Sequence, residues 1–308
     1  MDQRLRIGVI GLGNIAQKAY LPLYAGTQDE VEWLLMGRNS AHLNPITAKY
    51  HLNPVGRDLN ALDAIHLDAV MVHTPTQTHE ALVRHFLTRG VNVYVDKPLT
   101  EDFAQTQALY QLAEAQGCLL TVGFNRRFAP AIADLVDHRF KNAVSVVKTT
   151  GSAAGTPAPL LCDMFIHPLD TMLALTHFQV PQSPHYAMHL NSEGQLKYAS
   201  ICFDTGRLHA TATLDLMAGS DYEEASLIAT DGVYRVQDLQ SSTVIRSGRT
   251  QVSQADKWSP MLETRGFAPL VRAFIAAVRG TRDNPVAPAS SLLTHRMIAD
   301  YIAHFELA

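Results

Sequence analysis

The segment at residues 5–16, LRIGVIGLGNIA, decides the fold of this chain. It opens with a short apolar run that includes β-branched residues, which is typical of a buried parallel strand. A Gly11-x-Gly13-x-x-Ala16 turn follows, and a helix is expected after it. Gly11 permits a tight turn, Gly13 lets the backbone approach a pyrophosphate, and Ala16 lets the helix pack closely with its N-terminal amides facing the anion.

The position of this turn favours a dinucleotide-binding site over a purely structural glycine turn. The turn lies after a strand, before a helix and at the first crossover, which is the context that the fingerprint requires. The residues of the turn that are expected to bind the cofactor are Gly11, Gly13, Asn14, Ile15 and Ala16.

Alternating strands and helices continue from this turn to residue 123. The short apolar runs are at residues 6–10, 31–36, 68–73, 91–95 and 118–122. Amphipathic segments at 79–89 and 100–116 lie between them and end at Gly90 and Gly117. This pattern predicts a doubly wound parallel sheet over residues 1–123, a Rossmann domain that binds ligands at the carboxyl ends of its strands.

A different pattern follows over residues 124–308. Strand-like segments joined by short links are at residues 143–150, 185–191, 198–203, 207–216, 225–230 and 233–238. They predict an α+β domain with a largely antiparallel sheet, which binds the substrate and mediates oligomerisation. Helices at 163–176 and 265–279 are expected to cover one face of the sheet, and a last helix at 290–304 is expected to pack back on the first domain.

The other face of this second sheet is expected to be apolar. Alternation in residues 207–216 and 225–230 indicates a broad apolar surface, and such surfaces usually mark interfaces. The sequence therefore predicts a homodimer or homotetramer joined through this sheet.

The composition excludes several classes of protein. The 308 residues include 25 basic and 29 acidic side chains, a formal net charge of −4, so a nucleic-acid partner is not expected. The three cysteines, Cys118, Cys162 and Cys202, are far apart and indicate neither a disulfide framework nor a metal site. The N-terminus lacks the features of a secretory signal, and no segment approaches the roughly 18 to 20 apolar residues of a membrane span. A cytoplasmic protein without a metal is expected.

The end of the second strand bears on the choice of cofactor. Residues 31–36 run into Gly37-Arg38-Asn39-Ser40, without the carboxylate that binds the ribose 2′-hydroxyl of NAD(H). Arg38 and Ser40 instead offer donors for a 2′-phosphate, and the Arg38 guanidinium could also lie on the adenine face. NADP(H) is therefore expected in preference to NAD(H), with a solvated loop arginine as the alternative for Arg38.

With three further motifs, the chain resembles the Gfo/Idh/MocA oxidoreductases over essentially its whole length. The motifs are residues 74–79 (TPTQTH), Asp96-Lys97-Pro98, and residues 163–170 (DMFIHPLD). The wording of this last segment, with residues 125–128 (NRRF) and 265–267 (RGF), is most similar to the branch of MviM-type virulence-factor homologues. The resemblance also implies a dimer or tetramer.

The resemblance implies hydride transfer between a nicotinamide and a carbinol or keto carbon of a sugar, a cyclitol or a related polar metabolite. It implies that His167 accepts the hydroxyl proton and that Asp163 supports it or binds substrate. Histidine suits this role because its unperturbed pKa is near 6.5. Lys97, at the end of a strand, is expected to bind the substrate oxygen and stabilise a developing alkoxide. An exchange of roles, with Lys97 as the proton acceptor, remains open.

Other residues of the motifs have expected roles. Thr74 and Pro75 are expected to border the nicotinamide ribose. His79, Asp96 and Lys97 are counted with the cofactor site, and His79 is expected to form hydrogen bonds within its loop. Asp96 stands where the family usually has glutamate, and it is expected beside the cofactor or Lys97. Arg126 and Arg127 are each expected either to bind substrate or to join the two domains.

Two further residues of the 163–170 motif bear on the shape of the site. Phe165 stands where the family usually has glycine, which predicts a narrower or more apolar pocket. Asp170 is one turn beyond His167 and is expected to be a structural carboxylate.

Two other functions share this scaffold. One is a non-catalytic sensor or regulator that binds NADP, which the presence of both Lys97 and His167 disfavours. The other is a redox-neutral enzyme that oxidises its substrate transiently to achieve elimination or hydrolysis, which needs the same hydride geometry.

Overall fold

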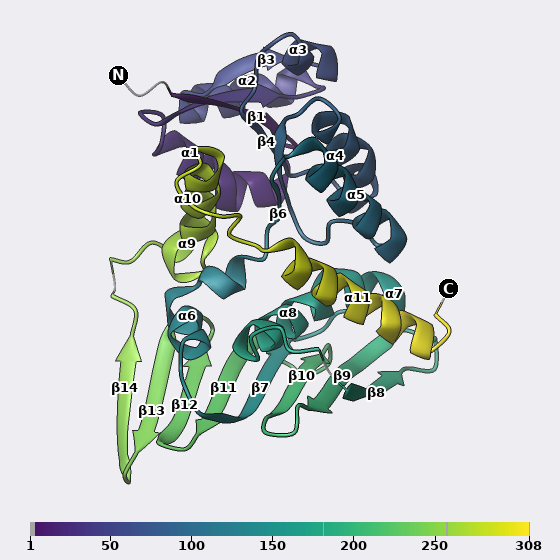
Figure 1. Cartoon of the computed structure of the whole chain (residues 1–308), viewed down its shortest axis with the longest axis vertical. Coiled ribbons are helices and arrows are strands. Elements are labelled where there is room, and N and C mark those ends of the chain that lie inside the picture. Colours follow the sequence, from purple (N-terminus) through teal and green to yellow (C-terminus); the bar gives the residue numbers. More distant parts are fainter. Residues whose placement is uncertain (1–3, 181, 257, 308) are drawn as a thin grey trace. The chain divides into compact units, whose positions relative to one another are not determined.

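The computed structural model describes residues 4–180, 182–256 and 258–307 (Figure 1). The chain folds into two compact units. The first contains the described residues up to Gly123 together with Leu270–Pro288, and the second contains Phe124–Pro269 and the residues from Ala289 onward. Leu270–Pro288 therefore lies in the first unit, whereas the sequence prediction assigned all of residues 124–308 to the second domain.

A six-stranded parallel sheet forms the centre of the first unit. Its strand order is β3-β2-β1-β4-β5-β6, the order of a Rossmann fold. The strands are β1 (Leu5–Ile10), β2 (Val31–Met36), β3 (Asn53–Gly56), β4 (Ala69–Val72), β5 (Asn92–Val95) and β6 (Leu120–Val122). The four residues of β3 are at most partly buried, and for that reason no apolar run marks this strand in the sequence.

Helices connect these strands: η1 (Ala16–Tyr20), α1 (Leu21–Ala25), α2 (Ser40–Tyr50), α3 (Leu59–Asp63), η2 (Thr76–Thr78), α4 (His79–Leu87) and α5 (Phe103–Gln116). The ends of α5 follow local signals. The Asp102 side chain accepts hydrogen bonds from the amides of Ala104 and Gln105, and Gly117 ends the helix in the left-handed conformation. The predicted helix at 100–116 therefore begins three residues later, after this cap.

The helix α10 (Phe267–Val278) was expected to cover the second sheet, but from Leu270 onward it belongs to the first unit. The Phe274 ring packs edge-on against Tyr94 of β5, with ring centroids 5.5 Å apart. Beyond the helix, the Asn284 side chain donates to the carbonyl of Leu120 and accepts from the Thr121 hydroxyl. These contacts with the edge strand β6 and with β5 hold the segment on the first sheet, whereas its apolar sequence alone did not specify which sheet it would cover.

The second unit contains an eight-stranded sheet of order β14-β13-β12-β11-β7-β10-β9-β8. Its strands are β7 (Lys141–Thr149), β8 (Gln182–Leu190), β9 (Leu196–Asp204), β10 (His209–Asp215), β11 (Tyr222–Ala229), β12 (Gly232–Gln237), β13 (Ser241–Arg246) and β14 (Arg249–Gln254). Neighbouring strands are antiparallel except for β7 and β10, which are parallel. This sheet and the first confirm the predicted fold class, although the mostly polar hairpin of β13 and β14 was not predicted.

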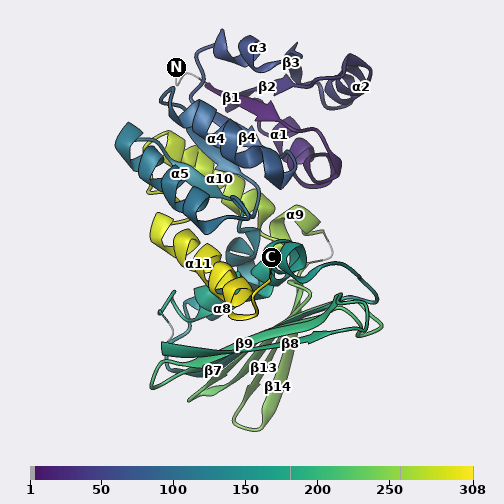
Figure 2. The same ribbon diagram turned by 90° about the vertical axis from the view of Figure 1, so that its right-hand side faces the viewer.

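Helices cover one face of this sheet (Figure 2). They are η3 (Asn125–Phe128), α6 (Pro130–Val136), α7 (Pro157–Leu160), η4 (Leu161–Phe165), α8 (Ile166–Leu175), α9 (Met261–Thr264) and α11 (Pro288–His304). The last helix, α11, was expected to pack back on the first domain; its residues from Ala289 onward are part of the second unit. The Tyr301 hydroxyl donates to the carbonyl of Ala187 in β8, and the Tyr301 ring packs against Phe165. These two contacts hold α11 within the second unit.

The two faces of the second sheet differ in composition. On β10, Ala210, Ala212 and Leu214 are fully buried and face the helices. Thr211 and Thr213 alternate with them and are half-buried on the other face. On β10 the apolar residues therefore lie beneath the helices, and the face without helices carries threonines there instead of the apolar side chains that the alternation predicts.

One described segment, Pro157–Leu175, is long and apolar enough to cross a membrane by length and composition. No such segment was predicted from the sequence. In the structure 67% of its apolar window is buried inside the protein. Its main part, α8, packs against β7 and β10 and is a core helix of the second unit.

A buried histidine in α11 makes stability depend on pH. His295 is 5% exposed, its Nδ1 donates to the carbonyl of Ser291, and burial lowers its pKa to about 4. Because the unfolded side chain has a pKa of about 6.5, the unfolded chain binds more protons between these two values. We expect the free energy of unfolding to fall by about 3 kcal/mol as the pH is lowered from 7 to 4 through this group alone. Urea unfolding of His295→Leu at both pH values should show a smaller loss than the wild type, and an equal loss would contradict this origin.

Candidate active site

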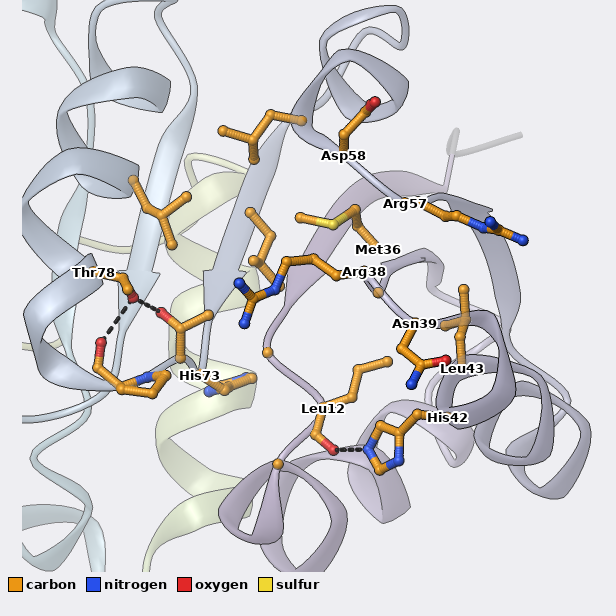
Figure 3. A pocket seen from close by; sticks show the side chains of 18 of the residues that line it. Leu12, Met36, Arg38, Asn39, His42, Leu43, Arg57, Asp58, His73 and Thr78 are labelled. Atoms are coloured by element: carbon orange, nitrogen blue, oxygen red, sulfur yellow. Dashed lines mark hydrogen bonds between the residues drawn. The ribbon is translucent and has the colours of Figure 1, made fainter.

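A cavity of about 850 Å³ opens in the first unit at the carboxyl ends of β1, β2 and β4 (Figure 3). Gly11 and Gly13 of the turn after β1 lie along it. Arg38 and His42 line one part of the cavity, and Thr74, Pro75 and Thr78 line another. The strand ends therefore form the cavity at the edge of the sheet where the sequence placed the cofactor.

The glycine turn fits the close approach of a ligand backbone or phosphate. Gly11 has φ +93°, and a Cβ there would lie 2.4 Å from the carbonyl carbon of His73, so no other residue fits without moving the backbone. A Cβ at Gly13 would have no atom within 4 Å. Gly13 therefore leaves open space above the turn, and the amide of Gln17 begins the following helix by donating to the Gly13 carbonyl.

Two arginines after β2 and β3 differ in direction. Arg38 extends into the cavity, toward the side where Thr78 lies, whereas Arg57 at the rim points away (Figure 3). Arg57 donates to the Ser40 hydroxyl at 3.1 Å. For Arg38, no hydrogen bond or ion pair with another described side chain is formed. Arg57 was missed in the sequence because it follows β3, a strand that no pattern indicated.

The predicted cofactor residues fall into two groups. Those that line the cavity are Gly11, Gly13, Arg38, Thr74 and Pro75. Those that do not line it, within the described part of the chain, are Asn14, Ile15, Ala16, Ser40, His79, Asp96 and Lys97. Among the latter, Ala16 is buried beneath the turn, as expected for helix packing, and Ser40 is linked to the rim through Arg57.

Asp96 belongs to a buried polar network at the ends of β4 and β5. His73 Nδ1 lies 3.1 Å from its carboxylate, and His73 Nε2 lies 2.7 Å from the Tyr24 hydroxyl. Burial holds the pKa of Tyr24 well above its usual value, so the phenol donates to Nε2 and Nδ1–H donates to Asp96. Burial opposes ionisation of Asp96, yet His73 and Tyr20 hold the pKa of the carboxyl below its usual value. Asp96, which is shorter than the glutamate usual in the family, is therefore held by His73, a partner that the sequence did not indicate.

His79 connects the two loops that carry the motifs of the first unit. It is 1% exposed, and its Nδ1 and Nε2 lie 3.0 Å and 2.8 Å from the carbonyl oxygens of Pro98 and Thr74. Both neighbours are acceptors, so the ring links the Thr74 loop to the Asp96-Lys97-Pro98 loop. Lys97 itself is half-buried after β5, and the Lys97–Pro98 peptide bond is cis.

In the second unit, Asp163 and His167 lie within one helical turn of each other. Asp163 is exposed in η4, a π-helical turn, and His167 is half-buried at the start of α8. Such π-helical turns inside helices are frequent at functional sites. Phe165 is fully buried between them and packs on Tyr301, so it belongs to the core of this unit.

Arg126 contacts His167 directly. Its Nη1 lies 2.7 Å from His167 Nδ1, and its Nε and Nη2 donate to both carboxylate oxygens of Glu223 in β11. The Arg126 residue is only 8% exposed. Glu223 was not predicted as part of the site, because it lies 97 residues from Arg126 and looks like any polar residue of an alternating strand.

Arg127 forms a second buried ion pair, with Asp170 of α8. Its Nε and Nη2 donate to the two carboxylate oxygens, and its Nη1 donates to the Ser290 hydroxyl. Asp170 also accepts from the Thr294 hydroxyl and is 1% exposed. These contacts give Asp170 a structural role within the second unit.

The two remaining motifs pack together. Gly266 has φ +79°, and a Cβ there would lie 2.1 Å from the carbonyl oxygen of Asn125. The Asn125 side chain donates to the carbonyl of Arg265 at 2.8 Å. The 265–267 segment therefore supports the loop that carries Arg126.

No group of three or more His, Cys, Asp or Glu side chains that could hold a metal occurs among residues 4–180, 182–256 and 258–307.

Both units of the chain match known protein families. The model of an oxidoreductase family with an NAD-binding Rossmann fold matches residues 5–124, and that of the YceM-like C-terminal domain matches residues 142–247. The chain is 33% identical over 302 residues to the protein YceM of Salmonella typhimurium, covering 96% of both chains.

Two further proteins extend the comparison. A UDP-N-acetylglucosamine 3-dehydrogenase of Acidithiobacillus ferrooxidans is 31% identical over 183 residues, which are 56% of this chain and 54% of that protein. The crystal structure of a Gfo/Idh/MocA family oxidoreductase from Vibrio cholerae has a TM-score of 0.90 at 28% identity and covers 98% of both chains.

The chain combines a Rossmann unit, whose glycine turn is open to a cavity, with a mostly antiparallel sheet that is covered on one face. This combination is typical of a class of dinucleotide-dependent oxidoreductases. The chain belongs to the Gfo/Idh/MocA family within that class. It is accordingly a dehydrogenase or reductase by class.

Proposed function

We propose that the protein is an NADP(H)-dependent oxidoreductase that acts on a carbinol or keto carbon of a sugar, a cyclitol or a related polar metabolite. The observation that carries this proposal is the cavity over Gly11 and Gly13, into which Arg38 extends. The open space at Gly13 and a guanidinium in the same cavity suit the pyrophosphate and the adenosine part of a dinucleotide. When bound, the nicotinamide supplies the acceptor or donor of the hydride.

The chain's own residues supply substrate binding and proton transfer in this proposal. Lys97, Asp163 and His167 are assigned to the oxygen of the reacting carbon, by resemblance to the family and by their residue types. Arg126 is assigned to the support of His167 because its guanidinium contacts both His167 and Glu223. The name of the Acidithiobacillus relative, a dehydrogenase of a nucleotide-linked amino sugar, supports a polar carbohydrate substrate.

An absorbance assay tests this function. Purified protein is incubated with NADP⁺ or NADPH and a panel of sugars, cyclitols, nucleotide sugars and their keto forms, and the nicotinamide absorbance band is followed. A net change with at least one substrate is expected. Product analysis of the same samples distinguishes the alternatives, since a redox-neutral enzyme converts substrate without a steady change in absorbance. A sensor would bind NADP(H) and convert no substrate, which would refute the proposal.

The choice of cofactor can be tested at the rim of the cavity. Arg38→Ala combined with Ser40→Ala is expected to weaken NADP(H) binding by about 1.5 to 3 kcal/mol, roughly 10- to 150-fold, because a charge-assisted phosphate contact is lost. Binding of NAD(H) should change much less. Arg57→Ala should show the same preference more weakly, since Arg57 adds a cation beside Ser40.

Isothermal titration of each variant with both cofactors measures the effect. Arg84→Ala serves as the control, because Arg84 is an exposed residue of α4 that pairs with Glu80 and does not line the cavity. Equal losses for the two cofactors in the double variant would show that Arg38 stacks on the adenine and does not read the phosphate.

We also propose a homodimer or homotetramer that forms through the face of the second sheet without helices. Thr211 and Thr213 lie half-buried on that face beside Ser200 and Cys202 of β9, an uncovered sheet surface of short side chains that could pack flat against a second copy. Light scattering should give two or four times the chain mass of 33.8 kDa. Thr211→Arg with Thr213→Arg should reduce this mass, and a wild-type monomer at micromolar concentration would refute the assembly.

We also propose that the enzyme is cytoplasmic. Its three described cysteines form no disulfide, which agrees with a reducing compartment.

A further inference from the structure

We infer that Arg126, oriented by Glu223, is a positioning residue that makes His167 a hydrogen-bond donor at Nε2 and not a proton acceptor. The inference rests on the contact between Arg126 Nη1 and His167 Nδ1, which are 2.7 Å apart. A guanidinium carries only donors, so Nδ1 must be the acceptor in this contact. A neutral imidazole that accepts at Nδ1 carries its proton on Nε2.

Glu223 determines where the Arg126 guanidinium points. Its two carboxylate oxygens bind Nε and Nη2, which leaves Nη1 directed at the imidazole. The backbone amide of Glu223 is in turn held by the side chain of Asp238 at 3.0 Å. This bidentate pair is 8% exposed at Arg126 and 9% exposed at Glu223, so the guanidinium is both oriented and shielded from water.

The charge of Glu223 supports this arrangement. Burial alone would raise the pKa of its carboxyl, but Arg126, Lys148 and Arg265 hold that pKa below the usual value. Glu223 therefore stays ionised near neutral pH and keeps its two bonds to Arg126. Lys148 contributes from 3.9 Å, on the Glu223 side of the pair.

Proton acceptance by His167 would disrupt this contact. Nε2 can accept a proton only when the neutral ring carries its own proton on Nδ1, a tautomer that directs an N–H at the Arg126 N–H, and acceptance then gives the imidazolium. The imidazolium directs an Nδ1–H at the Arg126 N–H and places two cations in contact, so the 2.7 Å hydrogen bond is lost. The arrangement thus favours an N–H over a lone pair at Nε2.

This conclusion deepens the proposed function and depends on it for its catalytic meaning. The Nε2–H of His167 would donate to the substrate oxygen and stabilise negative charge there. When bound, the oxidised nicotinamide would supply the hydride acceptor, and as the carbinol becomes a carbonyl the hydroxyl proton would move to the side-chain amine of Lys97. Of the two assignments that the sequence left open, the Arg126 contact favours Lys97 as the acceptor.

Nitrogen NMR of the full chain labelled with ¹⁵N-histidine tests the inference without cofactor or substrate. Long-range proton–nitrogen spectra distinguish the two tautomers and the imidazolium, and the His167 signals are assigned by their absence from His167→Gln. At about pH 6 an unperturbed histidine is largely protonated. Wild-type His167 is expected to be neutral there, with its proton on Nε2.

Variants show whether Arg126 is the cause. Arg126→Met and the milder Arg126→Gln should both give imidazolium at about pH 6, because the neighbouring cation is removed while Asp163 remains one turn away. Lys148→Gln is the matched control, since it removes a cation that lies 3.9 Å from the Glu223 carboxylate, and it should leave the wild-type pattern unchanged.

Three outcomes would overturn the inference: an imidazolium in the wild type at about pH 6, an Nδ1–H tautomer in the wild type, or an unchanged His167 pattern in a folded Arg126 variant. The wild-type spectrum decides the first two even where neither Arg126 variant folds. Because no turnover is measured, failure of this inference is distinct from failure of the dehydrogenase proposal, which the absorbance assay tests.

Discussion

Lys97→Ala is expected to lower turnover by about 10² to 10⁴, with NADP(H) binding changed by no more than a few-fold. Lys97 is half-buried after β5 and does not line the dinucleotide cavity, so its loss should affect the chemical step and spare the cofactor. Steady-state kinetics on a substrate from the panel, with cofactor titration, measure both effects. Lys49→Ala, an exposed lysine of α2 whose ammonium lies over Tyr50, is the control and should retain wild-type turnover.

The pH dependence separates the roles of Lys97 and His167. If the neutral amine of Lys97 accepts the proton, the rate of alcohol oxidation rises with pH in the wild type, and Lys97→Ala loses this rise. His167→Ala is also expected to lower turnover by about 10² to 10⁴ while keeping the rise. His167→Gln, which retains an N–H donor, should lose less than His167→Ala. If the rise survives in Lys97→Ala and disappears in His167→Ala, His167 is the acceptor, and full turnover in both would refute the proposed site.

Asp170→Asn is expected to destabilise the protein by about 3 to 5 kcal/mol, because it leaves the charge of a buried arginine without its partner. Arg127 donates to both carboxylate oxygens, and the side chains are 8% and 2% exposed. The Arg127 guanidinium also lies 4.2 Å from the centre of the Phe178 ring, a site with little room for water to replace the carboxylate. Urea unfolding gives the change in the free energy of unfolding.

Two variants complete this test. Thr294→Val removes one hydrogen bond to Asp170 and should cost only about 1 kcal/mol. Arg127→Met combined with Asp170→Leu should be less destabilising than the sum of the single changes, because the pair is removed together. A loss below about 1 kcal/mol in Asp170→Asn would show that Arg127 finds other partners and that the ion pair does not stabilise the unit.

The features that depend on residues close together in the chain could be predicted from the sequence alone. The glycine turn at Gly11 and Gly13 predicted the strand, the helix and the cofactor cavity, because turn geometry depends on residue types a few positions apart. Strand-like segments joined by short links predicted six of the strands of the second sheet within a few residues. The sequence also predicted that Asp163 and His167 lie within one helical turn, and that Asp170 has a structural role.

Other features depended on contacts between distant residues, so only the tertiary structure decided them. The apolar face of α10 could cover either sheet, and contacts with β5 and β6 assign it to the first. Glu223 became part of the site only when the fold placed Arg126 of η3 beside it, and His73 only when the pairing of β4 with β5 placed it beside Asp96. Turns and caps are specified by adjacent residues, whereas the partner of a buried charge is specified by which strands lie side by side, and no local pattern records that pairing.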